Sequence, residues 1–271
     1  MLRVVFWNVD GRRRDRHLVG LAVDNAADVI ILIEPPASAG RLGALTALGY
    51  NRVPGSTRFL ILSLQSVTWT RVSYPDPLAG VEFWRLSPTS GDSWLFAVVH
   101  APDRRNAPQD ETRALFFSQI STHLGQLERG NSPRRTVVLG DFNANPFEPS
   151  VMGASGFHAL GVRRVRQRTA RAVLRLGRRD FFYNPMWRLY GSDPSTDAAA
   201  ATYYHDKGNA ATEPFWHMLD QVLVRPEVAD RMPADRLRVL TTAGSESLVR
   251  PDGVPDRETA SDHLPVTFQL L

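Results

Sequence analysis

The sequence predicts an α/β fold in which short strands outnumber helices. Hydrophobic residues make up 43% of the 271-residue chain, which is enough for the core of one large domain. Most apolar residues fall in short runs rich in β-branched and aromatic side chains, which is typical of buried strands. Two longer segments between these runs repeat their apolar residues with a helical period.

Each expected strand is short, apolar and bounded by residues that favour turns. The strands are residues 2–7, 29–33, 59–63, 67–72, 81–86, 94–100, 136–139, 218–224 and 266–270. One helix is expected over residues 16–27, where one face carries Leu18, Leu21, Ala22 and Ala26. A second is expected over residues 108–127, with the apolar stripe Phe116, Ile120, Leu124 and Leu127.

No internal repeat or linker divides the chain, so we expect a single domain over residues 1–271. The loosest stretch, residues 191–211, is rich in Ser, Thr, Asp, Ala and Gly and is expected to be a long surface loop. The C-terminal residues Asp262 and His263 have to return to the site at the end of the first strand, which argues against a domain boundary in this stretch.

The composition excludes some chemistry and permits other chemistry. The absence of cysteine excludes disulfides, thiolate metal sites and cysteine nucleophiles. The net charge is +4 and Lys207 is the only lysine, so nearly all the basic residues are arginines, which permits a polyanionic partner. The first strand is too short for the apolar part of a signal peptide, and no long apolar run follows, so we expect a cytoplasmic protein.

Four short polar strings follow or end the expected buried strands. Residues 7–11 read Trp-Asn-Val-Asp-Gly, 33–34 read Ile-Glu, 140–143 read Gly-Asp-Phe-Asn and 261–263 read Ser-Asp-His. Their polar side chains are those that bind hard cations or donate to phosphate. Such a set of strand ends is well suited to metal-assisted cleavage of a phosphoester.

In this order and spacing, the strings resemble the motifs of the endonuclease/exonuclease/phosphatase superfamily, which includes deoxyribonuclease I and the exonuclease III-type abasic-site endonucleases. Leu219-Asp220 is similar to a further motif of that family, and the resemblance runs from Asn8 to His263. It implies a two-sheet β-sandwich with helices packed on both outer faces, in four layers. The expected strands and helices agree with this architecture but do not require it.

Three carboxylates are expected to hold the metal. Glu34 follows a nearly continuous apolar strand, so its side chain should emerge at the sheet edge as a Mg²⁺ ligand, for which Mn²⁺ can substitute. Asp10 lies two residues after Asn8 and therefore on the same face of an extended segment; the alternative is a turn residue before Gly11. The resemblance implies that Asp262 also faces the metal.

The remaining polar residues are expected to act on water and phosphate. Asp141 should orient or deprotonate the attacking water, Asn8 could hold Asp141, and Asn143 could donate to phosphate or merely form a turn. Neighbours on an extended chain point to opposite sides, so Asp262 is unsuited to orient His263, and the resemblance gives that task to Asp220. Such a pair fixes one tautomer and raises the imidazole pKa.

His100 ends the expected strand 94–100 and separates two branches of the family. The resemblance places a histidine here in deoxyribonuclease I and the sphingomyelinases, whereas the abasic endonucleases have a tyrosine. We expect His100 to protonate the leaving group or contact phosphate, the alternative being an ordinary strand-end histidine. Glu82 could orient it. The chain therefore combines features of two branches, which leaves its substrate open.

Residues 149–179 contain no acidic residue and accumulate arginines. Read as a helix, the segment gives one cationic ridge with 4-3-4-3 spacing, expected to bind nucleic acid: Arg164, Arg168, Arg171, Arg175 and Arg178. The alternatives are an Arg-rich solvated face or a membrane-surface helix, although the apolar stripe is thin. Tyr203, Tyr204, His205 and Trp216 could stack on a base, but ordinary loop packing is the simpler interpretation.

The first functional expectation is a Mg²⁺-dependent nuclease, and more specifically an endonuclease, that hydrolyses phosphodiester bonds in DNA or RNA. An alternative keeps the chemistry and changes the substrate to inositol phosphates or sphingolipid headgroups. A second alternative is a catalytically silent nucleic-acid-binding module. The sequence decides neither the substrate nor the endonuclease or exonuclease mode.

Overall fold

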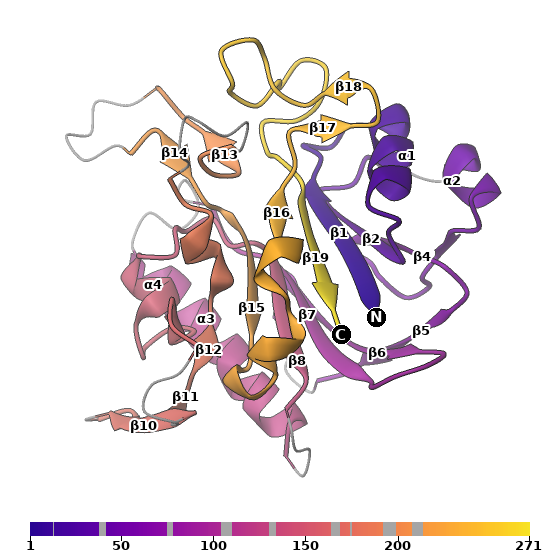
Figure 1. The fold of residues 1–271 in the computed structure, drawn as a ribbon. Helices are drawn as coiled ribbons and strands as arrows, with labels where there is room; N and C mark the ends of the chain where they lie inside the picture. Colours follow the sequence, from indigo (N-terminus) through magenta and orange to yellow (C-terminus); the bar gives the residue numbers. More distant parts are fainter. Residues whose placement is uncertain are drawn as a thin grey trace.

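The structure is a computed structural model that describes residues 1–12, 14–37, 42–74, 78–103, 110–129, 134–163, 169–173, 175–191, 199–207 and 214–271. Two mixed sheets face each other and carry helices on their outer faces (Figure 1). This four-layer α/β sandwich confirms the predicted fold class. No described helix has the length and apolarity needed to cross a membrane.

The first sheet has six strands in the order β16-β19-β1-β2-β4-β3. In chain order these strands are β1 (Leu2–Asn8), β2 (Val29–Ile33), β3 (Asn51–Arg52), β4 (Leu60–Ser63), β16 (Arg238–Val239) and β19 (Val266–Leu270). β1 runs parallel to β2 and antiparallel to β19. The carboxyl ends of β1 and β2 therefore meet the start of β19 at one end of the sheet.

The second sheet has seven strands in the order β5-β6-β7-β8-β15-β12-β9. They are β5 (Val67–Val72), β6 (Val81–Pro88), β7 (Trp94–His100), β8 (Thr136–Asp141), β9 (Ala159–Leu160), β12 (Phe182–Tyr183) and β15 (Asp220–Val224). β7 and β8 are parallel, and β15 runs antiparallel to β8 with Asp220 opposite Asp141.

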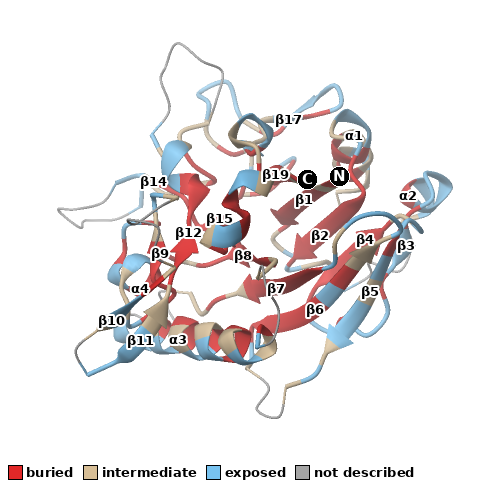
Figure 2. Ribbon diagram, turned by 60° about the horizontal axis from the view of Figure 1, so that its bottom comes forward, coloured by how far each residue is buried: buried red, intermediate tan, exposed pale blue. Residues whose placement is uncertain are grey.

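Side-chain alternation explains why both faces of the central strands are buried (Figure 2). On β1, Val4 and Phe6 pack between the sheets, whereas Val5 and Trp7 pack outward beneath α1 (Asp15–Asp24) and α2 (Gly43–Ala47). On the other outer face, α3 (Asp110–Leu127) packs on the second sheet through a stripe that includes Phe117, Ile120 and Leu124.

The shorter elements lie in the connections. The remaining helices are α4 (Pro149–Met152) and the 3₁₀ turns η1 (Pro185–Arg188), η2 (Pro226–Arg231) and η3 (Ala234–Arg236). The remaining strands form three hairpins: β10 (Ala170–Val173) with β11 (Gly177–Asp180), β13 (Tyr203–Tyr204) with β14 (Trp216–His217), and β17 (Thr242–Ala243) with β18 (Glu246–Ser247).

Two sequence interpretations are wrong in the described residues. The Arg-rich segment forms the β10–β11 hairpin where a basic helix was expected. A helix would stack the ridge arginines three and four residues apart over a thin apolar stripe. The hairpin instead puts Arg171 and Arg178 on opposite faces, although Arg171 lies opposite Arg179. The expected surface loop 191–211 contains β13, which pairs with β14. Residues 192–198 and 208–211 of that loop lie outside the described residues.

Candidate active site

A cavity of about 1210 Å³ opens between the two sheets, at the end where β1, β2, β7 and β8 finish. Eight of the residues expected from the sequence line it: Asn8, Asp10, Glu34, His100, Asp141, Asn143, Asp262 and His263. Asp220 does not line it and lies fully buried behind His263. The fold thus gathers residues that are spread along almost the whole chain.

Local backbone geometry turns several of these side chains into the cavity. Asp10, Glu34 and Asn143 have φ values of 49°, 48° and 48°, the left-handed region that non-glycine residues seldom adopt. Each of the three follows a strand end, so the left-handed backbone conformation turns its side chain away from the direction of the strand. Gly140 precedes Asp141, and a Cβ at this position would overlap the carbonyl oxygen of Val99, so only glycine lets β7 and β8 approach here.

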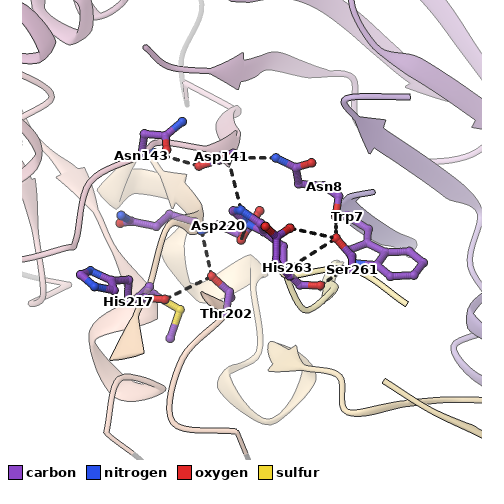
Figure 3. A network of polar contacts seen from close by, with 12 residues as sticks. Trp7, Asn8, Asp141, Asn143, Thr202, His217, Asp220, Ser261 and His263 are labelled. Carbon is purple, nitrogen blue, oxygen red and sulfur yellow. Dashed lines mark hydrogen bonds and ion pairs between the residues drawn. The ribbon is translucent and has the colours of Figure 1, made fainter. Parts of the chain in front are cut away.

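Asn8 joins the carboxylates of the two sheets. Its Nδ2 donates to Glu34 Oε1 at 3.1 Å and to Asp141 Oδ2 at 3.0 Å. Its Oδ1 accepts from the backbone N of Asp10, which fixes the orientation of the amide. Asn8 is 2% exposed, and Figure 3 shows its amide directed at Asp141.

His100 faces the same two carboxylates from β7. Its Nε2 lies 3.3 Å from Glu34 Oε1 and 4.0 Å from Asp141 Oδ2. Glu82 does not orient it, contrary to the suggestion from the sequence. That carboxylate binds the loop 56–58 instead, because it emerges from β6 toward the neighbouring sheet.

Asp220 and His263 form a buried pair. His263 Nδ1 lies 2.7 Å from Asp220 Oδ2, and its Nε2 lies 3.9 Å from Asp141 Oδ2 (Figure 3). Burial by itself lowers the pKa of His263, but Asp220, Asp141 and Asp262 outweigh it and raise the pKa to about 10. The imidazole therefore carries a positive charge at neutral pH, aimed at the centre of the cavity.

The carboxylates of Asp10 and Asp262 both form ion pairs with one arginine. Arg257 Nε lies 3.5 Å from Asp10 Oδ2 and 3.8 Å from Asp262 Oδ2. Arg12 Nε adds a second contact to Asp10 at 3.4 Å. Either carboxylate would have to exchange a guanidinium for a metal ion in order to act as a ligand.

Asn143 hydrogen-bonds the last residue of β8 and the loop that follows β7. Its backbone N donates to Asp141 Oδ1 at 2.9 Å, and its Nδ2 donates to the carbonyl oxygen of Ala101 at 3.0 Å. The first contact is the turn geometry considered from the sequence. In this arrangement Asn143 orients Asp141 as well as lining the cavity.

Glu34, His100 and Asp141 are the described residues that best fit a metal ion. One ligand atom from each lies within 4.8 Å of the other two. Carboxylate oxygens suit a hard divalent cation, and Glu34 is the most accessible of the three, with 41% of its side chain exposed.

The sequence interpretation set Tyr203 and His205 aside as loop packing and did not name His217. Tyr203, His205 and His217 line the cavity, and the ring of Tyr203 lies 4.8 Å from that of His263. Asn145 Oδ1 accepts from Met218 N, so its Nδ2 is a donor and His217 Nδ1 accepts from it at 3.0 Å. The aromatic cluster around residues 203–205 was the available signal, but its pairing with β14 was not visible.

The described residues of the expected arginine ridge, Arg171, Arg175 and Arg178, do not line the cavity. Arg171 lies opposite Arg179, Arg178 lies opposite Ala172 on the other face, and Arg175 occupies the turn with a φ of 66°. The hairpin precedes β12, whose Tyr183 pairs with Val224, the end of β15 away from Asp220. Figures 1 and 2 both place the hairpin far from β14. Arg164 and Arg168 lie outside the described residues.

Known structures share this fold over almost the whole chain. A complex of Danio rerio TDP2 with a single-stranded DNA product is 17% identical, with a TM-score of 0.60, covering 100% of this chain and 98% of that one. The Neisseria 3′ phosphatase NExo, bound to a product DNA hairpin, is 16% identical, with a TM-score of 0.58 and 100% coverage of both chains.

A third similar structure is an AP endonuclease from Archaeoglobus fulgidus, 17% identical, with a TM-score of 0.55, covering 100% of this chain and 99% of that one. A search of curated protein sequences found no match. The sequence profile of the Endonuclease/Exonuclease/phosphatase family matches residues 5–263, which span every group of the cavity described above. The chain therefore belongs to the Endonuclease/Exonuclease/phosphatase family.

Proposed function

We propose that the protein is a divalent-metal-dependent phosphodiesterase that cleaves nucleic acid, with DNA as the first substrate to test and RNA as the second. The observation that carries the proposal is the position of Asp141 Oδ2. This atom lies 3.0 Å from Asn8 Nδ2, 4.0 Å from His100 Nε2 and 3.9 Å from His263 Nε2. One buried carboxylate oxygen thus meets two imidazoles and an amide at the edge of a large cavity.

Glu34 is the proposed primary metal ligand, and Mg²⁺ is the proposed ion, for which Mn²⁺ can substitute. His100 and Asp141 lie close enough to assist, while Asp10 and Asp262 would first have to release Arg257. When bound, the metal would withdraw electron density from a phosphate oxygen and so favour attack at phosphorus.

Asp141 is the proposed group that orients the attacking water and accepts its proton. Asn8 and the backbone N of Asn143 hold both of its oxygens, so the carboxylate is fixed before substrate arrives. Its 2% exposure keeps competing water from the same oxygens. Asn8 cannot take up a proton itself, and its amide is suited to positioning only.

His263 is the proposed cation beside the phosphate. Asp220 holds its Nδ1, which leaves Nε2–H directed toward Asp141 and the cavity. A buried imidazolium stabilises the negative charge that develops on the phosphate oxygens during attack. His100, on the opposite side of Asp141, is placed to donate to the leaving oxygen or to contact the phosphate.

The similar structures support nucleic acid as the substrate class. Those of Danio rerio TDP2 and Neisseria NExo contain product DNA, and the Archaeoglobus protein is an AP endonuclease. NExo is a 3′ phosphatase, so release of a terminal phosphate is a second activity to test on the same polymer.

The test is cleavage of supercoiled plasmid, single-stranded DNA, RNA, abasic duplex and inositol phosphates, with Mg²⁺ and with EDTA. We expect Mg²⁺-dependent cleavage of a nucleic acid that Glu34→Gln and His263→Asn each reduce by about 100-fold or more. Glu258→Gln, an exposed acidic residue outside the cavity lining, is the matched control and should behave as wild type.

Each other outcome has a distinct meaning. Equal cleavage by wild type and both variants would reveal a contaminating nuclease and refute the proposal. Release of phosphate from inositol phosphates without cleavage of nucleic acid would replace it with the phosphatase alternative. Binding of DNA without turnover in Mg²⁺ or Mn²⁺, unchanged by Glu34→Gln, would identify a silent binding module.

A further inference from the structure

Glu82 is a buried carboxylate that connects the two sheets at the cavity. It lies at the start of β6 in the second sheet and is only 4% exposed. Most of its partners lie in the loop 56–58, which precedes β4 of the first sheet, and Trp84 of β6 and Arg71 of β5 also contact it. A buried carboxylate is costly unless it is well hydrogen-bonded, so its partners show what it is there to hold.

Both oxygens of Glu82 accept several hydrogen bonds. Oε1 accepts from Thr57 N at 2.9 Å, Thr57 Oγ1 at 3.2 Å and Arg58 N at 3.3 Å. Oε2 accepts from Ser56 Oγ at 2.8 Å and Trp84 Nε1 at 3.3 Å. Because two successive backbone N–H groups point at one oxygen, the loop conformation is fixed by this carboxylate.

The fixed loop places Arg58 at the same end of the first sheet as the proposed metal ligand. The antiparallel register of β2 and β4 ends with Leu32 opposite Leu60. Arg58 lies just before Leu60 and Glu34 just after β2, so both lie beyond this end of the ladder, where they line the cavity. β3, the next strand outward, carries Arg52, and both arginines line the cavity.

These two arginines differ from the others at the cavity in having no acidic partner. Among the described residues, neither Arg52 nor Arg58 lies within ion-pair distance of a carboxylate, and both residues are exposed. Arg257, by contrast, contacts Asp10 and Asp262. Two arginines that line one cavity without acidic partners favour an anion there, and a guanidinium fork matches the oxygens of a phosphate.

We propose that Arg52 and Arg58, with Glu82 as their positioning residue, bind a second phosphate of the substrate, adjacent to the one that is cleaved. The proposal rests on the proposed function, since it assumes that the scissile phosphate lies among Glu34, Asp141 and His263. All five side chains line the same cavity. A linear polyanion that lies along this cavity would contact the two arginines together with the three groups proposed for cleavage.

The test uses short oligonucleotides in which one linkage at a time is an uncharged methylphosphonate. With wild-type protein we expect a linkage next to the scissile one at which loss of the charge lowers kcat/KM about tenfold. Arg58→Ala and Arg52→Ala should lower kcat/KM for the native oligonucleotide by a similar factor, mainly through KM. In these two variants, the methylphosphonate at that same linkage should no longer lower kcat/KM. Arg85→Ala, an exposed arginine outside the cavity, is the matched control.

Glu82 is tested by its coupling to Arg58. Glu82→Ala should reproduce the loss of the linkage-specific penalty, and combining it with Arg58→Ala should add little further loss. Glu82→Gln retains one acceptor oxygen and should give partial rescue. A merely structural role of Glu82 would lower activity equally for every oligonucleotide, which would overturn its assignment.

The outcomes separate this proposal from the proposed function. Binding of uncleaved oligonucleotides is measured in parallel by fluorescence anisotropy with Ca²⁺ in place of Mg²⁺. If wild type cleaves but Arg52→Ala and Arg58→Ala match Arg85→Ala, the second-phosphate site is refuted and the nuclease stands. If no nucleic acid is cleaved but an inositol bisphosphate is hydrolysed with the same arginine dependence, the site stands and the nuclease falls. If neither nucleic acid nor inositol bisphosphate is hydrolysed, and neither arginine variant changes binding of the oligonucleotides, then both the nuclease proposal and the second-phosphate site are refuted.

Discussion

His263 Nδ1 lies 2.7 Å from Asp220 Oδ2, although 43 positions separate the two residues in the sequence. Asp220 begins β15 of one sheet, and His263 precedes β19 of the other, so the contact joins the two sheets behind the cavity. Thr202 adds a third segment, since its Oγ1 accepts from Asp220 N at 3.1 Å (Figure 3). The cation is therefore positioned by the assembled sandwich.

Replacing Asp220 by Asn should lower kcat by about 100-fold with a small change in KM. The amide keeps the size of the side chain but removes the charge that keeps His263 protonated, so stabilisation is lost in the transition state. Single-turnover cleavage measures this directly. A wild-type rate with Asp220→Asn would show that the pair does not act in catalysis. Circular dichroism of the variant serves as the folding control.

Replacing Arg257 by Ala should strengthen binding of Mn²⁺ about fivefold. The change removes a positive charge from Asp10 and Asp262, and two carboxylates near a divalent cation gain roughly 1 kcal/mol at an exposed site. Isothermal titration with Mn²⁺ is the measurement, and Arg250→Ala, whose guanidinium pairs with Asp252, is the control. Unchanged or weaker binding would count against Asp10 and Asp262 as metal ligands.

The β10–β11 hairpin is proposed to contact only long polyanions. Arg171 and Arg178 lie at the end of the fold opposite the cavity, so Arg171→Ala with Arg178→Ala should leave cleavage of short oligonucleotides unchanged. Affinity for a long duplex should fall, and the slope of log affinity against log salt should become shallower by about 0.9 for each phosphate that the variant no longer neutralises. If the variant and the wild-type protein bind the long duplex with the same affinity, the hairpin has no role in binding.

His158 should make the fold sensitive to acid. Burial, with Arg171 and Arg179 nearby, lowers the pKa of His158 to about 4, whereas an unfolded histidine titrates near 6.5. Between these values the unfolded chain binds a proton that the folded chain does not, so stability falls as pH falls through this window, by about 3 kcal/mol at most. Urea unfolding at several pH values measures the slope.

His158→Asn provides the comparison for that slope. Asparagine suits the left-handed backbone at this position, where φ is 56°, and does not titrate. The variant lacks the packing of the imidazole ring on Phe181 and should be less stable at pH 7, but its decrease in stability between pH 6.5 and 4 should be smaller. An equal slope in both proteins would mean that other groups cause the acid sensitivity.

The sequence pattern alone located the long strands and eight of the residues that line the cavity, whereas the four layers followed from the resemblance to the family. Periodicity located β1, β2, β7 and β8 because each must bury both faces, which requires continuous apolar runs. Polar residues at the ends of such runs, among them Asn8, Glu34 and Asp141, have no place in the core and must emerge at the sheet edge. This is why local patterns indicated so much of the site.

Only the tertiary structure decided which charges meet. Arg257 pairs with Asp10 and Asp262, and Glu82 binds the loop 56–58 rather than His100. Arg52 and Arg58 line the cavity, whereas the described arginines of the 164–178 segment, Arg171, Arg175 and Arg178, do not. The Arg-rich segment has a helical spacing of charges, yet it pairs as a hairpin. Charge spacing constrains local conformation weakly, and the partners of a long side chain depend on strands that are distant in sequence.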